Sequence, residues 1–194
     1  MKFSTKAIHL GQDPDPATGA VITPIYQTTT FAQEAPGVNK GYDYTRSGNP
    51  TRTALETVLA SMEGGKHGYA FSSGLGALTT LVMSLLKAGD HIIVCNDAYG
   101  GTNRFFEKVI KKFDVKAVYI DMTDPKNITE AVTDQTRMIF METPTNPLLR
   151  LVDLEESIKV AKDHNLIVAV DNTFATPYIP VSYTHLTLPT MCVV

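Results

Sequence analysis

Short runs of apolar residues recur along the chain and predict the strands of a sheet. Each run is rich in Val, Ile, Phe or Tyr and is bounded by polar or turn-forming residues, which is typical of strands. The runs are mostly continuous rather than alternating, which indicates strands that are covered on both faces. We therefore expect strands at 68–71, 91–95, 115–120, 136–142 and 166–171.

Between these runs, apolar residues recur three or four positions apart, which is the spacing of an amphipathic helix. Asn49 is expected to cap one helix and Pro50 to occupy its first turn. Asp124-Pro125 starts another helix, and Asp153 with Glu156 resembles a capping box that starts a further one. The remaining helices are expected at 72–86 and 103–113. In the helix that Asn49 caps, the inward face is expected to consist of Leu55, Val58, Leu59 and Met62. In the helix at 103–113 it is expected to consist of Phe106, Val109, Ile110 and Phe113.

Strands that alternate with helices predict an α/β fold with a mainly parallel sheet. In such sheets ligands bind beyond the carboxyl ends of the strands. The segments that follow the strands are therefore the candidate binding loops: 72–76, 96–102, 142–147 and 171–176.

The two ends of the chain differ from this pattern. Residues 1–48 are irregular and rich in Gly, Pro and Thr, so we expect an arm that packs on a neighbouring subunit. Residues 49–180 form the sheet domain, and residues 181–194 are a Thr- and Pro-containing tail without a clear period.

Composition narrows the class of protein. Hydrophobic residues make up 43% of the chain, charged residues 19%, and the net charge is −3, so neither a nucleic-acid nor a membrane partner is favoured. The two cysteines are far apart and the five histidines share no spacing, so no metal site is expected. The chain begins without the apolar run of a signal peptide, and its longest apolar runs hold about six residues, far short of a membrane span, so we expect a cytoplasmic protein.

The stretch "FSSGLGA" (71–77) carries the first candidate chemistry. Ser73, Gly74 and Leu75 lie where a strand is expected to become a helix, and a helix N-terminus offers free N–H groups to an anion such as phosphate. A tight turn with a serine cap explains the same residues. A dinucleotide site is a further alternative, but Thr79 stands where the third glycine of that fingerprint belongs.

Three more strand ends carry polar or aromatic candidates. Tyr99 precedes two glycines and could stack its ring on a flat cofactor, or it could pack on its own loop. Glu142 and Asn146 follow the next strand and could face the same crevice, or serve as a surface carboxylate and a turn residue. Asp171 could pair with a protonated ring nitrogen, as in pyridoxal 5′-phosphate (PLP) enzymes, or cap its own turn.

Taken together these stretches resemble the PLP-dependent enzymes of cysteine and methionine metabolism, in particular the cystathionine γ-lyase and γ-synthase branch. The matching segments run from about residue 5 to about residue 179. They are "AIHLGQDPDPATGAV", "PIYQTTTF", "YDYTRSGNPTR", "SSGLGA", "AYGGTNR", "ETPTNP" and "VDNTFATPY".

The resemblance implies the large PLP domain of a type I PLP enzyme, incomplete, with an N-terminal arm. It implies that Ser73, Gly74 and Leu75 hold the phosphate and that Asp171 holds the ring nitrogen. Thr173 would lie on one face of the cofactor and Tyr99, also a candidate catalytic residue, on the other. Asn146 would bind near the ring hydroxyl and the substrate, and Glu142 would line the substrate pocket. Tyr44 and Arg46 would reach the phosphate in a neighbouring subunit, within a homotetramer built from dimers that share active sites.

The resemblance ends near Pro180. The family's Ser-x-Thr-Lys stretch, whose lysine bonds to the cofactor, is absent, and no lysine follows Lys162. We therefore interpret the chain as an N-terminal fragment, with 181–194 as a non-family tail of the kind that adaptor sequence leaves, or as a natural truncation with a divergent end.

The expected parent activity is γ-elimination or γ-replacement on cystathionine or O-acyl-homoserine. The alternatives are an inert PLP-binding fragment, or another family activity: cystathionine β-lyase, O-acetylhomoserine sulfhydrylase or methionine γ-lyase.

Overall fold

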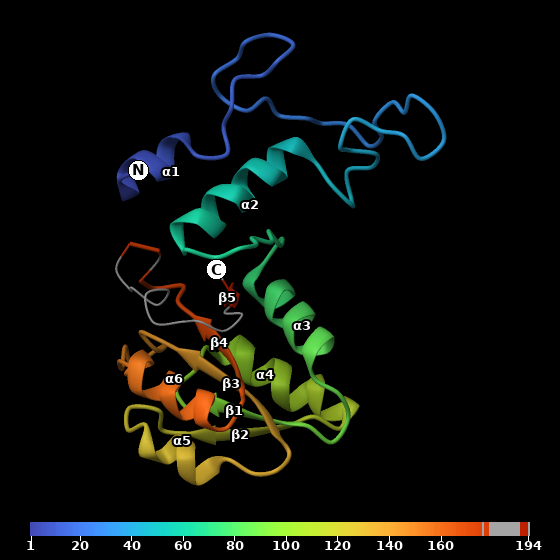
Figure 1. The fold of residues 1–194 in the computed structure, drawn as a ribbon. Coiled ribbons are helices and arrows are strands. Elements are labelled where there is room, and N and C mark those ends of the chain that lie inside the picture. Colours follow the sequence, from blue (N-terminus) through green and yellow to red (C-terminus); the bar gives the residue numbers. More distant parts are fainter. Residues whose placement is uncertain (176, 179–190, 194) are drawn as a thin grey trace. The chain divides into compact units, whose positions relative to one another are not determined.

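A computed structural model describes residues 1–175, 177–178 and 191–193 (Figure 1). The chain forms two compact units, Met1–Ala70 and Phe71–Val194, which we call unit 1 and unit 2. Within the described residues no helix combines the length and apolar character that crossing a membrane requires.

Unit 1 consists of two helices joined by a long irregular segment. Helix α1 spans Phe3–His9 and was not predicted, and α2 spans Pro50–Met62. Asn49 caps α2 as expected: its side chain accepts a hydrogen bond from the Thr51 N–H at 2.9 Å. Its amide nitrogen also donates to the carbonyl of Tyr26, so the same side chain ties the irregular segment to the helix.

The inward face expected for α2 is only partly covered. No residue of this helix is fully buried, and Leu55 is 51% exposed. The reason is that a periodic apolar face buries only where another element packs against it, and α1 is too short to cover α2.

Unit 2 has the predicted α/β fold, although the domain expected at 49–180 also included α2, which lies in unit 1. Its sheet has the order β2-β1-β3-β4-β5, and every neighbouring pair is parallel. The elements are α3 (Gly74–Leu85), β1 (His91–Cys95), α4 (Gly100–Lys108), the 3-10 helix η1 (Ile110–Phe113), β2 (Lys116–Ile120), α5 (Lys126–Ala131), β3 (Thr136–Glu142), α6 (Leu154–Asp163), β4 (Ile167–Asp171) and β5 (Met191–Val193).

Strands β1, β3 and β4 are buried on both faces, as predicted, whereas β2, at the edge of the sheet, is only partly buried. Alternate residues of a strand point to opposite faces, so each strand contributes to two cores. Ile92 and Phe140 belong to a core with residues of α3 and α4. Ile93 and Ile139 belong to a second core with residues of α5 and α6. Figure 1 accordingly shows α4 and α6 on opposite sides of the sheet.

The predicted strand at 68–71 is absent from the structure. These residues belong to no strand, and the aromatic rings of Tyr69 and Phe71 are 67% and 47% exposed. A strand needs a neighbour for its backbone hydrogen bonds, and no described segment pairs with this one, which lies across the boundary of the two units.

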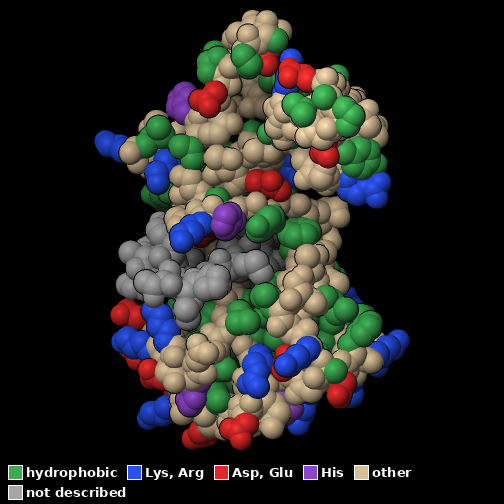
Figure 2. Space-filling model, turned by 45° about the vertical axis from the view of Figure 1, so that its right-hand side comes forward, with side chains coloured by type: hydrophobic (Ala, Val, Ile, Leu, Met, Phe, Trp, Pro, Cys, Tyr) green, Lys and Arg blue, Asp and Glu red, His purple; other side chains and the backbone are tan. Residues whose placement is uncertain are grey.

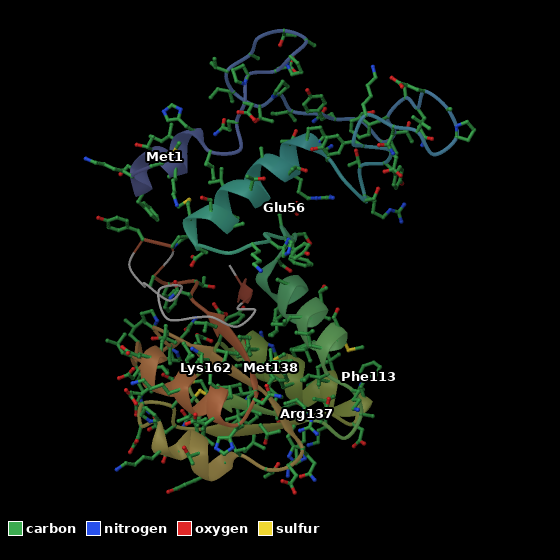
Figure 3. All side chains as sticks on the ribbon, viewed as in Figure 1. Met1, Glu56, Phe113, Arg137, Met138 and Lys162 are labelled. Carbon is green, nitrogen blue, oxygen red and sulfur yellow. The ribbon has the colours of Figure 1, made fainter. Side chains whose placement is uncertain are left out.

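The helix predicted at 103–113 is shifted and divided. It begins at Gly100, ends at Lys108, and continues as η1. Phe106 and Ile110 are buried as expected, but Val109 and Phe113 are 43% and 52% exposed, and Phe113 projects outward (Figure 3). The helix is interrupted at Val109, and the tighter turn of the 3-10 helix changes the phase of the side chains after it, which explains why Phe113 leaves the core.

The tail contains one element that its sequence did not predict. Met191–Val193 form β5, which pairs with β4 in parallel from Ala169 to Asp171. Sheet pairing uses backbone groups, so it requires no apolar period. The rest of the tail, residues 181–190 and 194, lies outside the described residues, as do residues 176, 179 and 180.

Surface charge is mixed. On the face of unit 2 that Figure 2 shows, basic and acidic side chains are interspersed, in keeping with the small net charge of −3.

Candidate cofactor site

A cavity of about 380 Å³ lies at the carboxyl edge of the sheet in unit 2. Because parallel strands end at the same edge, residues that follow β1, β3 and β4 meet there, together with the N-terminus of α3. The cavity is lined by all eight site residues that the sequence places in unit 2: Ser73, Gly74, Leu75, Tyr99, Glu142, Asn146, Asp171 and Thr173. Tyr99 and Asp171 therefore share one cavity with the turn at 73–75, as expected.

Four lining residues were missed by the sequence analysis: Leu78, Thr102, Pro144 and Phe174. Three of them lie inside the stretches "AYGGTNR", "ETPTNP" and "VDNTFATPY" that carried the resemblance. Leu78 is one helical turn beyond Gly74, so it follows from the orientation of α3, which a sequence pattern does not define.

The N-terminus of α3 is arranged as an anion site. Ser73 caps the helix, and its hydroxyl oxygen accepts a hydrogen bond from the Gly76 N–H at 3.0 Å. Among the described residues, the N–H groups of Gly74 and Leu75 have no hydrogen-bond partner. These N–H groups and the positive end of the helix dipole therefore offer donors to a phosphate.

Tyr99 lies at the N-terminus of α4 with its side chain 45% exposed. Its backbone N–H donates to Glu142 Oε2 at 2.8 Å. Its ring lies against Gly101, where an added Cβ would lie only 2.3 Å from the ring's Cε1 atom. Glycine at this position is therefore what allows the ring to take its present place.

Glu142 is buried, with 4% of its surface exposed, and ends β3. Burial raises the pKa of its carboxyl group from 4.5 to about 7, because water no longer solvates the charge; the negative charges of Asp171 and Asp97 add to the rise. The N–H groups of Tyr99 and Asn146 oppose it.

Asp171 ends β4 and is only partly buried. Its Oδ1 atom accepts two hydrogen bonds from Thr173, one from the backbone N–H at 3.1 Å and one from the hydroxyl group at 2.6 Å. The carboxylate is thereby oriented by the turn that follows it, and Thr173 is brought to the same part of the cavity.

Tyr44 and Arg46 belong to unit 1 and form a pair there. The Arg46 guanidinium donates to the Tyr44 hydroxyl oxygen at 2.8 Å and lies 5.1 Å from the centre of its ring. Their contact with a cofactor phosphate remains a prediction.

The other described parts of the chain add little chemistry. A more open hollow of about 560 Å³ in unit 1 is lined by α1, α2 and residues 64–69, and contains none of the predicted site residues. Within residues 1–175, 177–178 and 191–193, no group of three or more His, Cys, Asp or Glu side chains could hold a metal ion.

The cavity matches PLP in its chemistry and size. PLP is a flat ring with a phosphate at one end and a ring nitrogen that carries a proton. The cavity offers free N–H groups at a helix N-terminus, an exposed aromatic ring and a carboxylate at a third point. Its volume lies within the range of about 300–1,000 Å³ that is usual for small-molecule sites.

The family is established by comparison. The model for Cys/Met metabolism PLP-dependent enzymes matches residues 4–185, so the chain belongs to this family, whose cofactor is PLP. This assignment removes the dinucleotide interpretation of the turn at 73–76.

Named relatives are highly similar. The chain is 53% identical over 176 residues to a probable cystathionine γ-synthase of Herpetosiphon aurantiacus, covering 91% of this chain and 55% of the relative. It is 50% identical over 178 residues to a cystathionine β-lyase of Coxiella burnetii, covering 91% and 46%. The crystal structure of metB from Corynebacterium glutamicum superposes with a TM-score of 0.90 at 47% identity, covering 92% of this chain and 46% of that one. The chain thus spans about half the length of the relatives that it matches.

Proposed function

We propose that the whole protein is a PLP-dependent trans-sulfuration enzyme that breaks or makes the bond between the γ-carbon and sulfur of cystathionine, or replaces the acyloxy group of O-acyl-homoserine. The observation that carries this proposal is the single cavity in which an anion-binding helix end, an aromatic ring and a carboxylate meet. The relatives are named γ-synthase and β-lyase, so β-elimination and the other family activities are alternatives for the same site.

Each residue has a role that follows from its chemistry. The N–H groups of Gly74 and Leu75 bind the phosphate, and the Tyr99 ring orients the flat cofactor by stacking. Asp171 stabilises the proton on the ring nitrogen through its negative charge. PLP, when bound in this way, supplies an electron sink for the charge that develops on the substrate's α-carbon. Asn146 and Glu142 border the part of the cavity where the substrate is expected.

Residues outside unit 2 complete the proposal. Tyr44 and Arg46 would bind the phosphate in a neighbouring subunit, and the family resemblance implies a homotetramer of the cytoplasm. Packing of unit 1 on a neighbouring subunit would explain why it exposes apolar side chains such as Val21, Ile22 and Ile25, each at least 69% exposed.

For the 194-residue polypeptide by itself we propose cofactor binding without turnover. No lysine is among the described residues that line the cavity, so a covalent bond to the cofactor and a lysine base have no source there. Positioned proton transfer alone is typically worth about 10²–10⁴-fold in rate.

A PLP titration tests the site. The purified chain should bind PLP saturably, and Asp171→Asn should raise the dissociation constant about tenfold, because a charge-assisted contact is replaced by a neutral one of the same shape. Asp163→Asn, at the exposed end of α6, is the matched control and should bind like the unmodified chain. Equal binding by Asp171→Asn would contradict the proposed site, and turnover of cystathionine by the 194-residue chain would contradict its proposed inactivity.

A further inference from the structure

Two hydrogen bonds in opposite directions connect the loop after β1 with residues 142–145, which include the last residue of β3 and the start of the following loop. The Tyr99 backbone N–H donates to Glu142 Oε2 at 2.8 Å. The Thr145 hydroxyl group donates to Asp97 Oδ2 at 2.5 Å. Each loop therefore supplies one carboxylate and one donor, and the pair of bonds closes a ring between the two loops.

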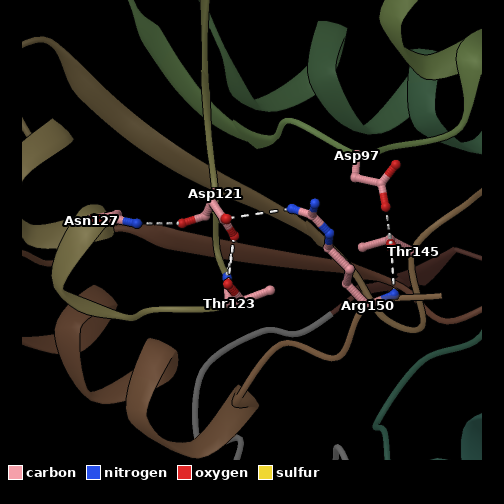
Figure 4. Close-up of polar contacts among 6 residues, drawn as sticks. All are labelled: Asp97, Asp121, Thr123, Asn127, Thr145 and Arg150. Carbon is pink, nitrogen blue, oxygen red and sulfur yellow. Dashed lines mark hydrogen bonds and ion pairs between the residues drawn. The ribbon is translucent and has the colours of Figure 1, made fainter. Parts of the chain in front are cut away.

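The direction of the second bond follows from the partners of Thr145. This residue is 1% exposed, and its hydroxyl oxygen accepts a hydrogen bond from the Arg150 N–H at 2.9 Å. The hydroxyl proton is then free to point at Asp97 (Figure 4). Asp97 is therefore an acceptor with a fixed partner.

The far end of the same segment is also anchored. The Arg150 guanidinium contacts Asp121 Oδ2 at 3.4 Å, and Asp121 Oδ1 accepts from the Thr123 N–H and hydroxyl groups at 2.9 and 2.6 Å (Figure 4). The Asn127 side chain holds the Asp121 carbonyl at 2.8 Å. Residues 142–150 are thus attached at both ends.

The two bonds connect two segments of the chain that line the cavity. Tyr99 lines it from the loop after β1, and Asn146, next to Thr145, lines it from the loop after β3. Asp97 does not line the cavity, whereas Glu142 lines it with one oxygen already bound to the Tyr99 backbone.

We propose that Asp97 and Glu142 are positioning residues, which hold the loop that carries Tyr99 and the loop that carries Asn146 at the separation that a flat cofactor requires. The proposal deepens the proposed function and rests on it where it concerns PLP. The hydrogen bonds themselves join only protein groups, so they can be tested separately.

The ionisation of Glu142 should make its hydrogen bond to the Tyr99 N–H depend on pH. Glu142 is faced by the carboxylates of Asp171 at the end of β4 and Asp97 after β1, and it acts on the thiol of Cys95 in β1. Its carboxyl group gains and loses a proton near pH 7, and a charged acceptor binds an N–H group more strongly than a neutral one. The Tyr99 N–H should therefore respond to pH around neutrality.

The first experiment follows the Tyr99 amide of the cofactor-free chain by ¹H–¹⁵N NMR from pH 5 to pH 9. The amide shift should titrate with a midpoint near 7. Glu142→Gln keeps an acceptor oxygen but has no proton to exchange, so its Tyr99 amide should show no such transition. A flat titration in the unmodified chain, or an identical transition in Glu142→Gln, would overturn the role of Glu142.

The second experiment measures PLP affinity. Asp97→Ala should raise the PLP dissociation constant about tenfold, the effect of losing one charge-assisted hydrogen bond. Asp97→Asn keeps an acceptor for Thr145 and should restore affinity to within about threefold. Unchanged affinity in Asp97→Ala, or no recovery in Asp97→Asn, would overturn the role of Asp97.

The two readouts separate the inference from the proposed function. A chain whose Tyr99 amide titrates as expected but which binds no PLP would refute the proposed cofactor site of the chain and the PLP part of the inference, while confirming the bond between Glu142 and Tyr99. Binding of PLP without any response of the Tyr99 amide would support the proposed cofactor site and refute the bond between Glu142 and Tyr99.

Discussion

Replacing Glu142 by glutamine should change how the stability of unit 2 depends on pH. The unfolded chain has an ordinary glutamate pKa of 4.5, whereas burial holds the folded pKa at about 7. Between these two values the folded state holds a proton that the unfolded state has lost. Stability therefore falls as the pH rises from about 4.5 to about 7, and the loss is complete above pH 7.

The size of the effect follows from the shift. One unit of pKa corresponds to about 1.4 kcal/mol, so the rise from 4.5 to about 7 corresponds to about 3 kcal/mol in the free energy of unfolding. Glu142 is only 4% exposed but lines the cavity, where water screens its charge, so about 3 kcal/mol is an upper limit. Glu142→Gln removes the titration while keeping an acceptor for the Tyr99 N–H group.

Urea unfolding measured at pH values from 5 to 8.5 tests the prediction. The chain has no tryptophan, so far-UV circular dichroism is the suitable signal. The free energies of unfolding of Glu142→Gln and of the unmodified chain should be closest at pH 5. Toward pH 8 the unmodified chain should become less stable relative to the variant by up to about 3 kcal/mol. Glu130→Gln, on the exposed side of α5, is the matched control and should give no such divergence. A constant difference between Glu142→Gln and the unmodified chain across this range would refute the reasoning.

Two further substitutions test the site and the core. Gly101→Ala should displace the Tyr99 ring, because the new Cβ would lie 2.3 Å from Cε1, and PLP titration should show up to about tenfold weaker binding with unchanged circular dichroism; full affinity would show that the ring position is unimportant. Phe106→Ala should destabilise unit 2 by about 3–5 kcal/mol in urea unfolding, because the side chain is 1% exposed and its ring lies 6.2 Å from that of Phe140. Phe113→Ala, at a position 52% exposed, should stay within about 1 kcal/mol, and equal losses in the two variants would contradict the assigned core.

The alternation of apolar runs and amphipathic segments determined the fold class. Strands β1 and β3 have the bounds that their apolar runs predicted, and the cap residues Asn49 and Asp153 start α2 and α6. These features are local: a run long enough to cross a buried sheet, or a side chain that reaches the first free N–H of its own helix, is encoded by neighbouring residues.

The absence of a strand at 68–71 and the exposure of Phe113 could not be predicted from local sequence. A strand exists only if another segment offers its backbone, and a helical face is buried only if the helix keeps its phase. Both conditions depend on residues that are distant in the sequence or on the local geometry of one turn.

The candidate site shows the same division. The parallel sheet rule was sufficient to place Tyr99 and Asp171 at one edge, because the carboxyl ends of parallel strands meet there. The partners of the buried carboxylate came only from the tertiary structure: Glu142 accepts a hydrogen bond from a backbone N–H 43 residues away in the chain. Burial raises the pKa of Glu142 because the surrounding elements exclude water, and no stretch of sequence by itself encodes that exclusion.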